Sequence, residues 1–181
     1  MEKQSMHRKE IRMATVTLVV FVAVVGCGYH FKGTDLAPPD GVRTIAITVL
    51  ENRTWESGIE TIFTSDLAYE FTRSKVLRVV GRDTADAVLS GRIASLTIDT
   101  ISHTASYYSD ERRVTITLDL VLKRADGSAI IWSDSALSDK EAFKVVDPLD
   151  KLGTEKNRRV AIETISERLA EKIHNRILQD F

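Results

Sequence analysis

The stretch Val114-Thr115-Ile116-Thr117-Leu118-Asp119-Leu120-Val121-Leu122-Lys123 has the most regular pattern in the chain. Its even-numbered positions are all valine, isoleucine or leucine, whereas its odd-numbered positions are mostly threonine or charged residues. Successive side chains of a strand point to opposite faces, so the alternation predicts a strand with one buried and one polar face. Antiparallel sheets commonly have this two-sided character.

A hairpin is predicted directly after this strand. Ala125-Asp126-Gly127 suits a three-residue turn with glycine in the left-handed region, and residues 129–138 then form the returning strand. That turn length pairs Leu122 with Ile130 and places Trp132 in the core. A two-residue Asp-Gly turn would instead move Ile130 and Trp132 to the polar face, which argues against it.

Upstream, the pattern changes from strand to helix and back. Residues 42–50 alternate and predict a half-buried strand. Ser57-Gly58-Ile59-Glu60 has capping-box spacing, with Ser57 as the N-cap of an amphipathic helix that reaches Lys75. Residues 76–80 are a short strand or the start of the strand that follows.

The next strand is expected over residues 86–101, whose two faces are both partly apolar. Gly91 suggests a bulge at which the buried face switches. Residues 102–112 are polar and predict a long loop. Further on, Asp147-Pro148 is typical of a helix start, and isoleucines and leucines at three- and four-residue spacing predict a long final helix to Phe181.

The resulting order is strand, helix, strand, strand, strand, helix. Because each helix has one apolar stripe and each clear strand one apolar face, we expect an α+β fold. Its simplest form is a two-layer sandwich, with a mixed four-stranded sheet and two helices packed on one face. The other face is threonine-rich and is either an ordinary solvated surface or a surface for a partner.

The N-terminal region resembles a bacterial lipoprotein signal peptide. Residues 1–12 are weighted toward Lys and Arg, residues 13–25 are almost wholly apolar, and Val24-Val25-Gly26 precede Cys27. The apolar run is short for a transmembrane helix, which needs about 20 residues. We therefore predict cleavage after residue 26 and lipidation of Cys27. The alternative is an uncleaved membrane anchor that ends in a free thiol.

This interpretation divides the chain into a signal peptide at 1–26, a lipid-anchored tether at 27–41 and a single domain at 42–181. Pro38-Pro39-Asp40-Gly41 predicts that an extended spacer and a turn lead into the domain. Gly28 follows the cysteine, and the absence of aspartate at this position favours the outer membrane.

Composition argues against several functions. Without residues 1–26, 21 lysines and arginines face 24 aspartates and glutamates, a net charge of −3 that does not suit a nucleic-acid-binding protein. Cys27 is the only cysteine and the four histidines lack metal-ligand spacing, so we expect no disulfide and no metal site. No catalytic motif is present, and we expect no enzyme activity and no cofactor other than a covalent lipid.

Cys27-Gly28-Tyr29-His30-Phe31-Lys32-Gly33 resembles the start of the mature chain in the LptE family of lipopolysaccharide-assembly lipoproteins. The order of the elements and the Asp147-Pro148 entry to the last helix also match that family. The chain departs from better-known members because it lacks a long C-terminal tail, and its loop at residues 102–112 is not recognisably the same.

The resemblance implies a non-enzymatic role at the outer membrane. LptE-like proteins occupy the lumen of the large β-barrel LptD, help it to assemble and help to deliver lipopolysaccharide to the outer leaflet. Candidate lipopolysaccharide contacts are basic residues in regions that match the family, beside Tyr107 and Tyr108; they are Arg112, Arg113, Lys151 and Lys156. The alternative for each is an ordinary solvated surface charge.

A second class of function fits the tether and the size of the domain. The chain could be a lipoprotein accessory factor of another envelope machine, either a secretin pilot or an activator of cell-wall synthases. The aromatic residue, histidine, apolar residue and lysine that follow Cys27-Gly28 favour the LptE family over this alternative. A periplasmic hydrolase is disfavoured because catalytic motifs are absent.

Overall fold

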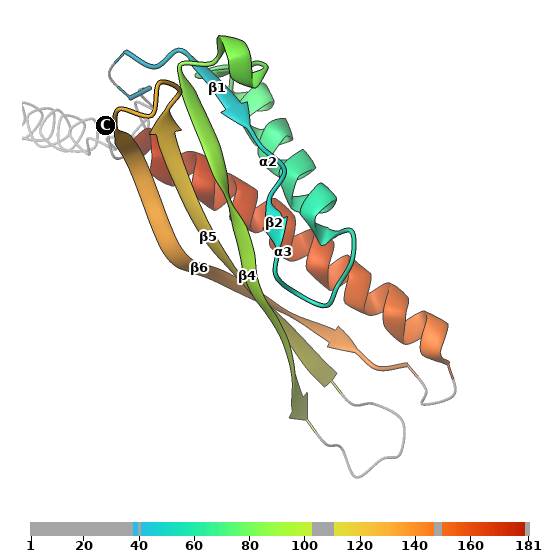
Figure 1. Cartoon of the computed structure of the whole chain (residues 1–181). Coiled ribbons are helices and arrows are strands. Elements are labelled where there is room, and N and C mark those ends of the chain that lie inside the picture. The colour runs from blue at the N-terminus through green and yellow to red at the C-terminus, as the bar shows by residue number, and fades with distance from the viewer. Residues whose placement is uncertain (1–37, 40, 103–110, 147–149, 180–181) are drawn as a thin grey trace, which may run out of the picture. The chain divides into compact units, whose positions relative to one another are not determined.

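Two helices pack against one face of a mixed β-sheet (Figure 1). The computed structural model describes residues 38–39, 41–102, 111–146 and 150–179. In chain order the elements are β1 (Thr44–Ile47), β2 (Glu51–Asn52), α2 (Ile59–Ser74), β3 (Arg78–Val79), the 3-10 helix η1 (Arg82–Thr84), β4 (Ala87–Ser102), β5 (Glu111–Arg124), β6 (Ile130–Lys144) and α3 (Lys151–Gln179). The predicted α+β two-layer architecture is confirmed.

The sheet has six strands rather than the expected four. Its order is β3-β1-β4-β5-β6, and β2 also pairs with β4. The expected strand at 42–50 ends at Ile47; the Thr48 N–H still donates to the Leu89 carbonyl of β4 at 3.0 Å, and the Leu50 N–H donates to the Thr64 hydroxyl of α2 at 3.2 Å. Val49, which the alternation placed on the buried face, is 68% exposed. The segment at 76–80 contains a separate strand, β3, which pairs parallel with β1.

The buried face of β4 switches as expected, but at a different residue. Leu89 and Ile93 are fully buried before the switch, and Leu96 is buried after it. The register with β5 shifts between Ile93 and Ser95, so the bulge lies at Ala94 and the prediction of a bulge at Gly91 is wrong. The extra residue moves the following side chains to the opposite phase of the pleat.

The β5–β6 hairpin forms, and its register differs from the predicted one. Gly127 has the expected left-handed conformation, with φ of 74°. However, Leu122 pairs with Trp132 rather than with Ile130, because a register shift follows that pair. Trp132 is 8% exposed and lies in the core as predicted, whereas Ile130 is 62% exposed.

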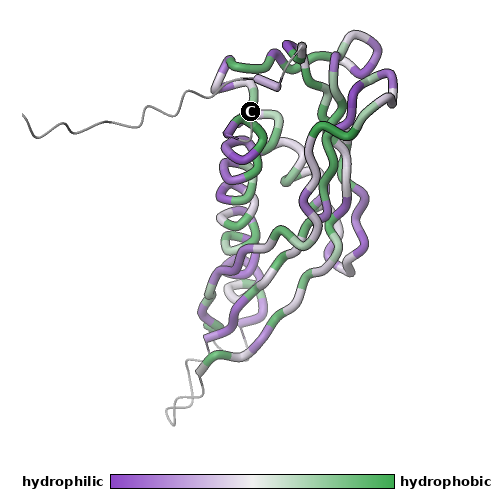
Figure 2. Tube along the Cα trace, turned by 90° about the vertical axis from the view of Figure 1, so that its left-hand side faces the viewer, coloured by the Kyte–Doolittle hydropathy of each residue, from purple (hydrophilic) through white to green (hydrophobic). Residues whose placement is uncertain are grey.

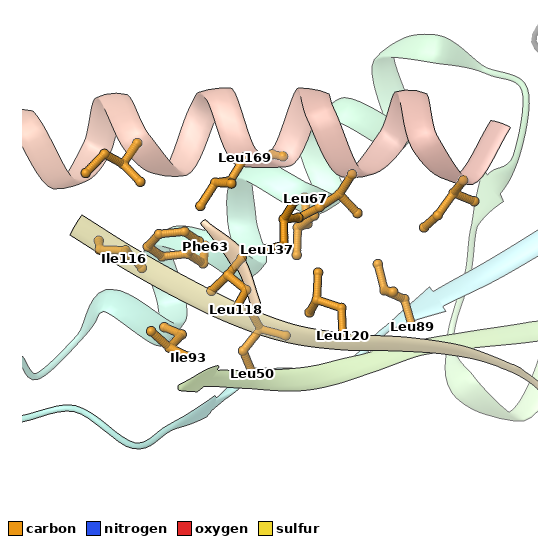
Figure 3. Close-up of a cluster of buried hydrophobic side chains, with 14 of the residues drawn as sticks. Leu50, Phe63, Leu67, Leu89, Ile93, Ile116, Leu118, Leu120, Leu137 and Leu169 are labelled. Atoms are coloured by element: carbon orange, nitrogen blue, oxygen red, sulfur yellow. The ribbon is translucent and has the colours of Figure 1, made fainter. Parts of the chain in front are cut away.

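The core fills the space between the helices and the sheet (Figure 3). Figure 2 shows that the hydrophobic positions of the long helix lie on its side toward the sheet. The predicted stripe of α3 is fully buried; its members are Ile162, Ile165, Leu169, Ile173 and Ile177. These side chains contact α2 residues such as Phe63 and Leu67 and the even-numbered side chains of β5 in one continuous cluster.

The two helix starts differ from expectation. The N-cap of α2 is Gly58, in the left-handed region with φ of 86°, so the prediction of Ser57 as the cap is wrong. Glu60 still accepts a hydrogen bond from the Gly58 N–H at 3.1 Å. At α3, the Asp150 carboxylate accepts the Gly153 N–H at 2.9 Å and serves as the cap. Asp147 and Pro148 lie outside the described residues.

Candidate functional site

The four predicted contact residues lie at one end of the domain (Figure 1). Arg112 and Arg113 are near the start of β5, and Lys151 and Lys156 are in the first two turns of α3. The end of β6 connects them, because Lys144 pairs with Glu111 of β5 and its carbonyl accepts the Asn157 side chain of α3 at 2.9 Å.

Arg112 and Arg113 lie on opposite faces of the sheet. Arg112 is in phase with the buried Val114 and pairs with Phe143, so its side chain is on the helix side. Its Nε atom is buried without a hydrogen-bond partner. Arg113 pairs with Ala142 and lies on the open face. Of the two, Arg113 is therefore better placed to meet a ligand from solvent.

Lys151 and Lys156 are both exposed on α3. Lys156 lies one helical turn from each of two exposed apolar residues, Leu152 at 84% and Val160 at 52%. Val146, just before the helix, is also 43% exposed. This surface thus combines cations with apolar side chains.

A groove beside this surface separates α3 from the end of β6. It has a volume of about 270 Å³ and is lined by Glu141, Ala142, Phe143 and Lys144 of β6 and by Asn157, Val160, Ala161 and Thr164 of α3. Its walls mix apolar side chains with one lysine and one carboxylate. The groove therefore presents both apolar and charged side chains to solvent.

One supporting residue was missed by the sequence analysis. Arg158 donates to the Glu56 carboxylate at 2.5 Å and to Glu155. Its guanidinium also lies over the Trp55 ring, 5.1 Å from the centroid. Arg158 therefore holds the loop between β2 and α2 against α3 on the flank away from the groove. No spacing in the sequence indicates this contact, because Glu56 and Arg158 are 102 residues apart.

Neither a metal-binding cluster nor a membrane-spanning helix is found among the residues that the structure describes. In these segments, no three His, Cys, Asp or Glu side chains converge in a way that would hold a metal ion. No described helix combines the length and the apolar character needed to cross a bilayer. Cys27, Tyr107 and Tyr108 lie outside the described residues, and lipidation of Cys27 stays a prediction.

The fold places this chain in a class of small two-layer α+β domains. The protein CT253 from Chlamydia trachomatis matches with a TM-score of 0.50 and 9% identity, over 75% of this chain and 95% of that chain. Lipoprotein B from Nitrosomonas europaea has a TM-score of 0.49 and 13% identity, over 83% and 90% of the two chains. A minor lipoprotein from Acinetobacter baumannii has values of 0.46 and 16%, over 77% and 93%.

The sequence shows to which family this protein belongs. The profile of the LptE family, described as lipopolysaccharide-assembly, matches residues 42–177. The match covers well over half of the chain, and this protein belongs to the LptE family. No curated protein sequence matches the chain.

Proposed function

We propose that this protein is an outer-membrane lipoprotein of the lipopolysaccharide transport machinery. In this role it occupies and supports the LptD barrel and aids the insertion of lipopolysaccharide into the outer leaflet, without catalysing a reaction. The observation that carries the proposal is the family match over residues 42–177.

The proposed anchor is a lipid on Cys27. A thiolate is a good nucleophile for a diacylglyceryl group, and two or more acyl chains bind a membrane stably where one does not. In cells grown with radiolabelled palmitate, the wild-type protein should carry label and Cys27→Ser should not. Equal labelling of the two proteins would contradict the anchor.

The proposed working surface is the end that holds Arg113, Lys151 and Lys156. Lysine and arginine side chains suit the phosphates of lipid A and the carboxylates of the core sugars. Leu152 and Val160, exposed on the same helix, would accompany the apolar part of the ligand. The combination of cations and apolar side chains fits lipopolysaccharide better than a purely anionic ligand.

Charge reversal tests this surface. We expect the triple change Arg113→Glu, Lys151→Glu and Lys156→Glu to weaken binding of purified lipopolysaccharide about tenfold, since three exposed ionic contacts of about 0.5 kcal/mol each sum to about 1.5 kcal/mol. The matched control reverses three exposed cations away from this surface; they are Arg82 of η1, Lys123 at the end of β5 and Lys172 in the second half of α3. Equal binding by the triple variant and the control would reject the surface. Arg112 is tested separately with Arg112→Gln, because a buried glutamate would destabilise the fold.

A further inference from the structure

The outer edge of β6 is protected by side chains. The backbone N–H and C=O of Lys140 point away from β5. The N–H donates to the Asp139 carboxylate at 2.8 Å, and the carbonyl accepts a hydrogen bond from the Arg168 guanidinium at 2.9 Å. The Lys144 carbonyl is taken by Asn157 at 2.9 Å. Lysines on an edge and side chains that occupy its backbone groups discourage the addition of another strand.

A second edge of the sheet lies on β4, in the part of the strand that follows its pairing with β2. The parallel partners of β4 end with β2, whose last pair is Asn52 with Ile93. In the described part of the chain, residues 95–100 of β4 pair only with β5, and a second register shift at Ile101 follows them. Half of this long strand therefore has a neighbour on one side only.

The register identifies the backbone groups on this edge. Before the bulge, Ile93 faces β2, because its carbonyl accepts the Arg53 N–H at 3.1 Å. The bulge at Ala94 shifts the phase by one residue, and N–H and C=O groups alternate between the two sides of a strand. Leu96, Ile98 and Thr100 consequently direct their N–H and C=O groups away from β5.

None of the protective features of β6 recurs on this edge. The sequence Ser95-Leu96-Thr97-Ile98-Asp99-Thr100-Ile101 contains neither lysine nor proline. Among the described residues, no hydrogen bond reaches the outward backbone groups of Leu96, Ile98 or Thr100. Thr97, Asp99, Thr100 and Ile101 are exposed. An edge that is rich in β-forming residues and has free backbone groups is suited to strand addition.

We propose that the β4 edge over Ser95–Ile101 binds an extended segment of a partner protein as an added β-strand. The segment would carry a lysine or arginine opposite Asp99 on the open face and an apolar residue opposite Ile98 on the helix side. Asp99 is opposite Arg113 in the β5 register, but none of the ion pairs between described residues includes Asp99. A cation from the partner would therefore complement a carboxylate without an ionic partner among the described residues.

A second copy of the chain complements this edge less well. Antiparallel pairing about a two-fold axis at Ile98 would place Asp99 of one copy opposite Thr97 of the other, so the carboxylate gains no cation. Self-association is accordingly an outcome that would contradict the proposal. It would be detected as a dimer of the purified full chain in analytical ultracentrifugation.

A synthetic peptide tests the edge directly. The probe is acetyl-Thr-Val-Lys-Val-Thr-Val-Thr-amide, whose lysine is placed opposite Asp99 in an antiparallel register. We expect binding to the full chain to slow hydrogen exchange at the amides of Leu96, Ile98 and Thr100, which alternate with amides already bonded to β5. The same peptide with N-methyl groups at alternate positions, or with glutamate in place of lysine, should bind at least tenfold more weakly.

Proline variants separate binding from folding. Ile98→Pro removes an N–H that faces away from β5 and also part of a side chain that packs against the core. Hydrogen exchange at the amides that bond to β5 should show that the β4–β5 pairing persists, while peptide binding is lost. Ala142→Pro is the matched control, because Ala142 has the same outward phase on the other edge, between Lys140 and Lys144. Asp99→Lys should reverse the preference to the glutamate peptide. Equal binding by Ile98→Pro and Ala142→Pro, or no charge preference, would overturn the inference.

This inference and the proposed function fail in distinguishable ways. If LptD is recovered with every variant but the peptide does not bind, the edge is not a strand-addition site and the proposed function stands. If LptD is not recovered with the wild-type protein, the proposed function fails, while peptide binding still decides the role of the edge.

Discussion

At Gly91, β4 approaches β5 so closely that no side chain fits. A Cβ atom at this position would lie 2.2 Å from the Asp119 carbonyl oxygen and 2.7 Å from a methyl group of Leu120. The glycine therefore permits the close approach of two paired strands rather than forming the bulge that the sequence suggested. Sequence alone does not separate these two roles, because both favour glycine inside a strand.

We predict that Gly91→Ala lowers the free energy of unfolding by about 3 kcal/mol, because the backbone carbonyl cannot move without disturbing the sheet. Urea denaturation measures the change. Gly81→Ala is the matched control, since no atom lies within 4 Å of its added Cβ, and it should change stability by less than about 0.5 kcal/mol. Equal effects of the two substitutions would contradict the close approach at Gly91.

Asp119 stabilises a second bulge in the hairpin, which lies at Ala136 of β6. Its carboxylate accepts the N–H of Ala136, which has a left-handed φ of 72°, and pairs with Arg92 at 2.7 Å. The Ala136 hydrogen bond, followed by Arg92, lowers the pKa of Asp119 below its usual value. A lowered pKa in the folded state means that this stabilisation is present above the unfolded pKa of about 4 and is lost as the pH falls through the folded value.

Asp119→Ala should therefore lower the free energy of unfolding by about 1 to 3 kcal/mol at pH 7. The difference from wild type should shrink as the pH falls below about 4, because the wild-type carboxylate becomes protonated. Unfolding curves at pH 7, 5 and 3 provide the measurement. A difference that stays constant with pH would argue against the charged hydrogen bonds as its cause.

At the scale of the elements, Arg158 joins α3 to the loop before α2. Its side chain is 15% exposed and Glu56 is 19% exposed, so the pair is largely removed from water. Removing Arg158 would leave the largely buried Glu56 carboxylate without its partner, which lowers the free energy of unfolding more than the loss of a surface ion pair does. Arg158 thus fixes the loop against α3, while Asn52 holds it from within by donating to the Glu56 carbonyl at 2.7 Å.

Arg158→Ala should destabilise the protein by about 2 to 3 kcal/mol. It should also change the fluorescence of Trp55, whose ring loses the guanidinium above it. Arg159→Ala is the control, because the ion pair of Arg159 with Glu163 lies on the exposed face of the helix, and it should have an effect below about 0.5 kcal/mol. Unchanged Trp55 emission in Arg158→Ala would contradict the contact.

The elements with strong periodicity were predictable, and the irregularities between them were not. The alternation over Val114–Leu122 and the spacing from Ile162 to Ile177 record burial directly, so β5 and α3 follow from the sequence. The hairpin register depends on the bulges in β6, where one extra residue moves Ile130 out of the core. Bulges leave little trace in composition, because their cause is the fit between strands that are distant in sequence.

At the scale of the whole molecule, the candidate site was only partly predictable. The resemblance placed Arg112, Arg113, Lys151 and Lys156 in matching regions, and the structure brings the two segments to one end. The opposite faces of Arg112 and Arg113 were missed because residues 102–112 were predicted to form a loop, whereas β5 begins at Glu111. The sequence also did not indicate that Leu152 and Val160 accompany Lys156. Those features depend on the pleat of β5 and on which flank of α3 is left uncovered.

The start of β1 and the cationic surface lie at opposite ends of the domain (Figure 1). The chain enters at Pro38 and Pro39, and β1 begins at Thr44, at the end where α3 finishes. The cationic surface lies at the opposite end, where α3 begins. In the proposed function, a lipid at Cys27 would hold the first end near the membrane and leave the second end to meet lipopolysaccharide.

Recovery of the partner tests the central claim most directly. The full chain, tagged at its C-terminus, is purified from detergent-solubilised outer membranes, and co-purifying proteins are quantified by mass spectrometry. The proposed function predicts LptD in roughly a one-to-one ratio with the tagged chain, with the Cys27→Ser variant recovered from outer membranes in much smaller amounts. A secretin, a cell-wall synthase or no barrel in place of LptD would contradict it.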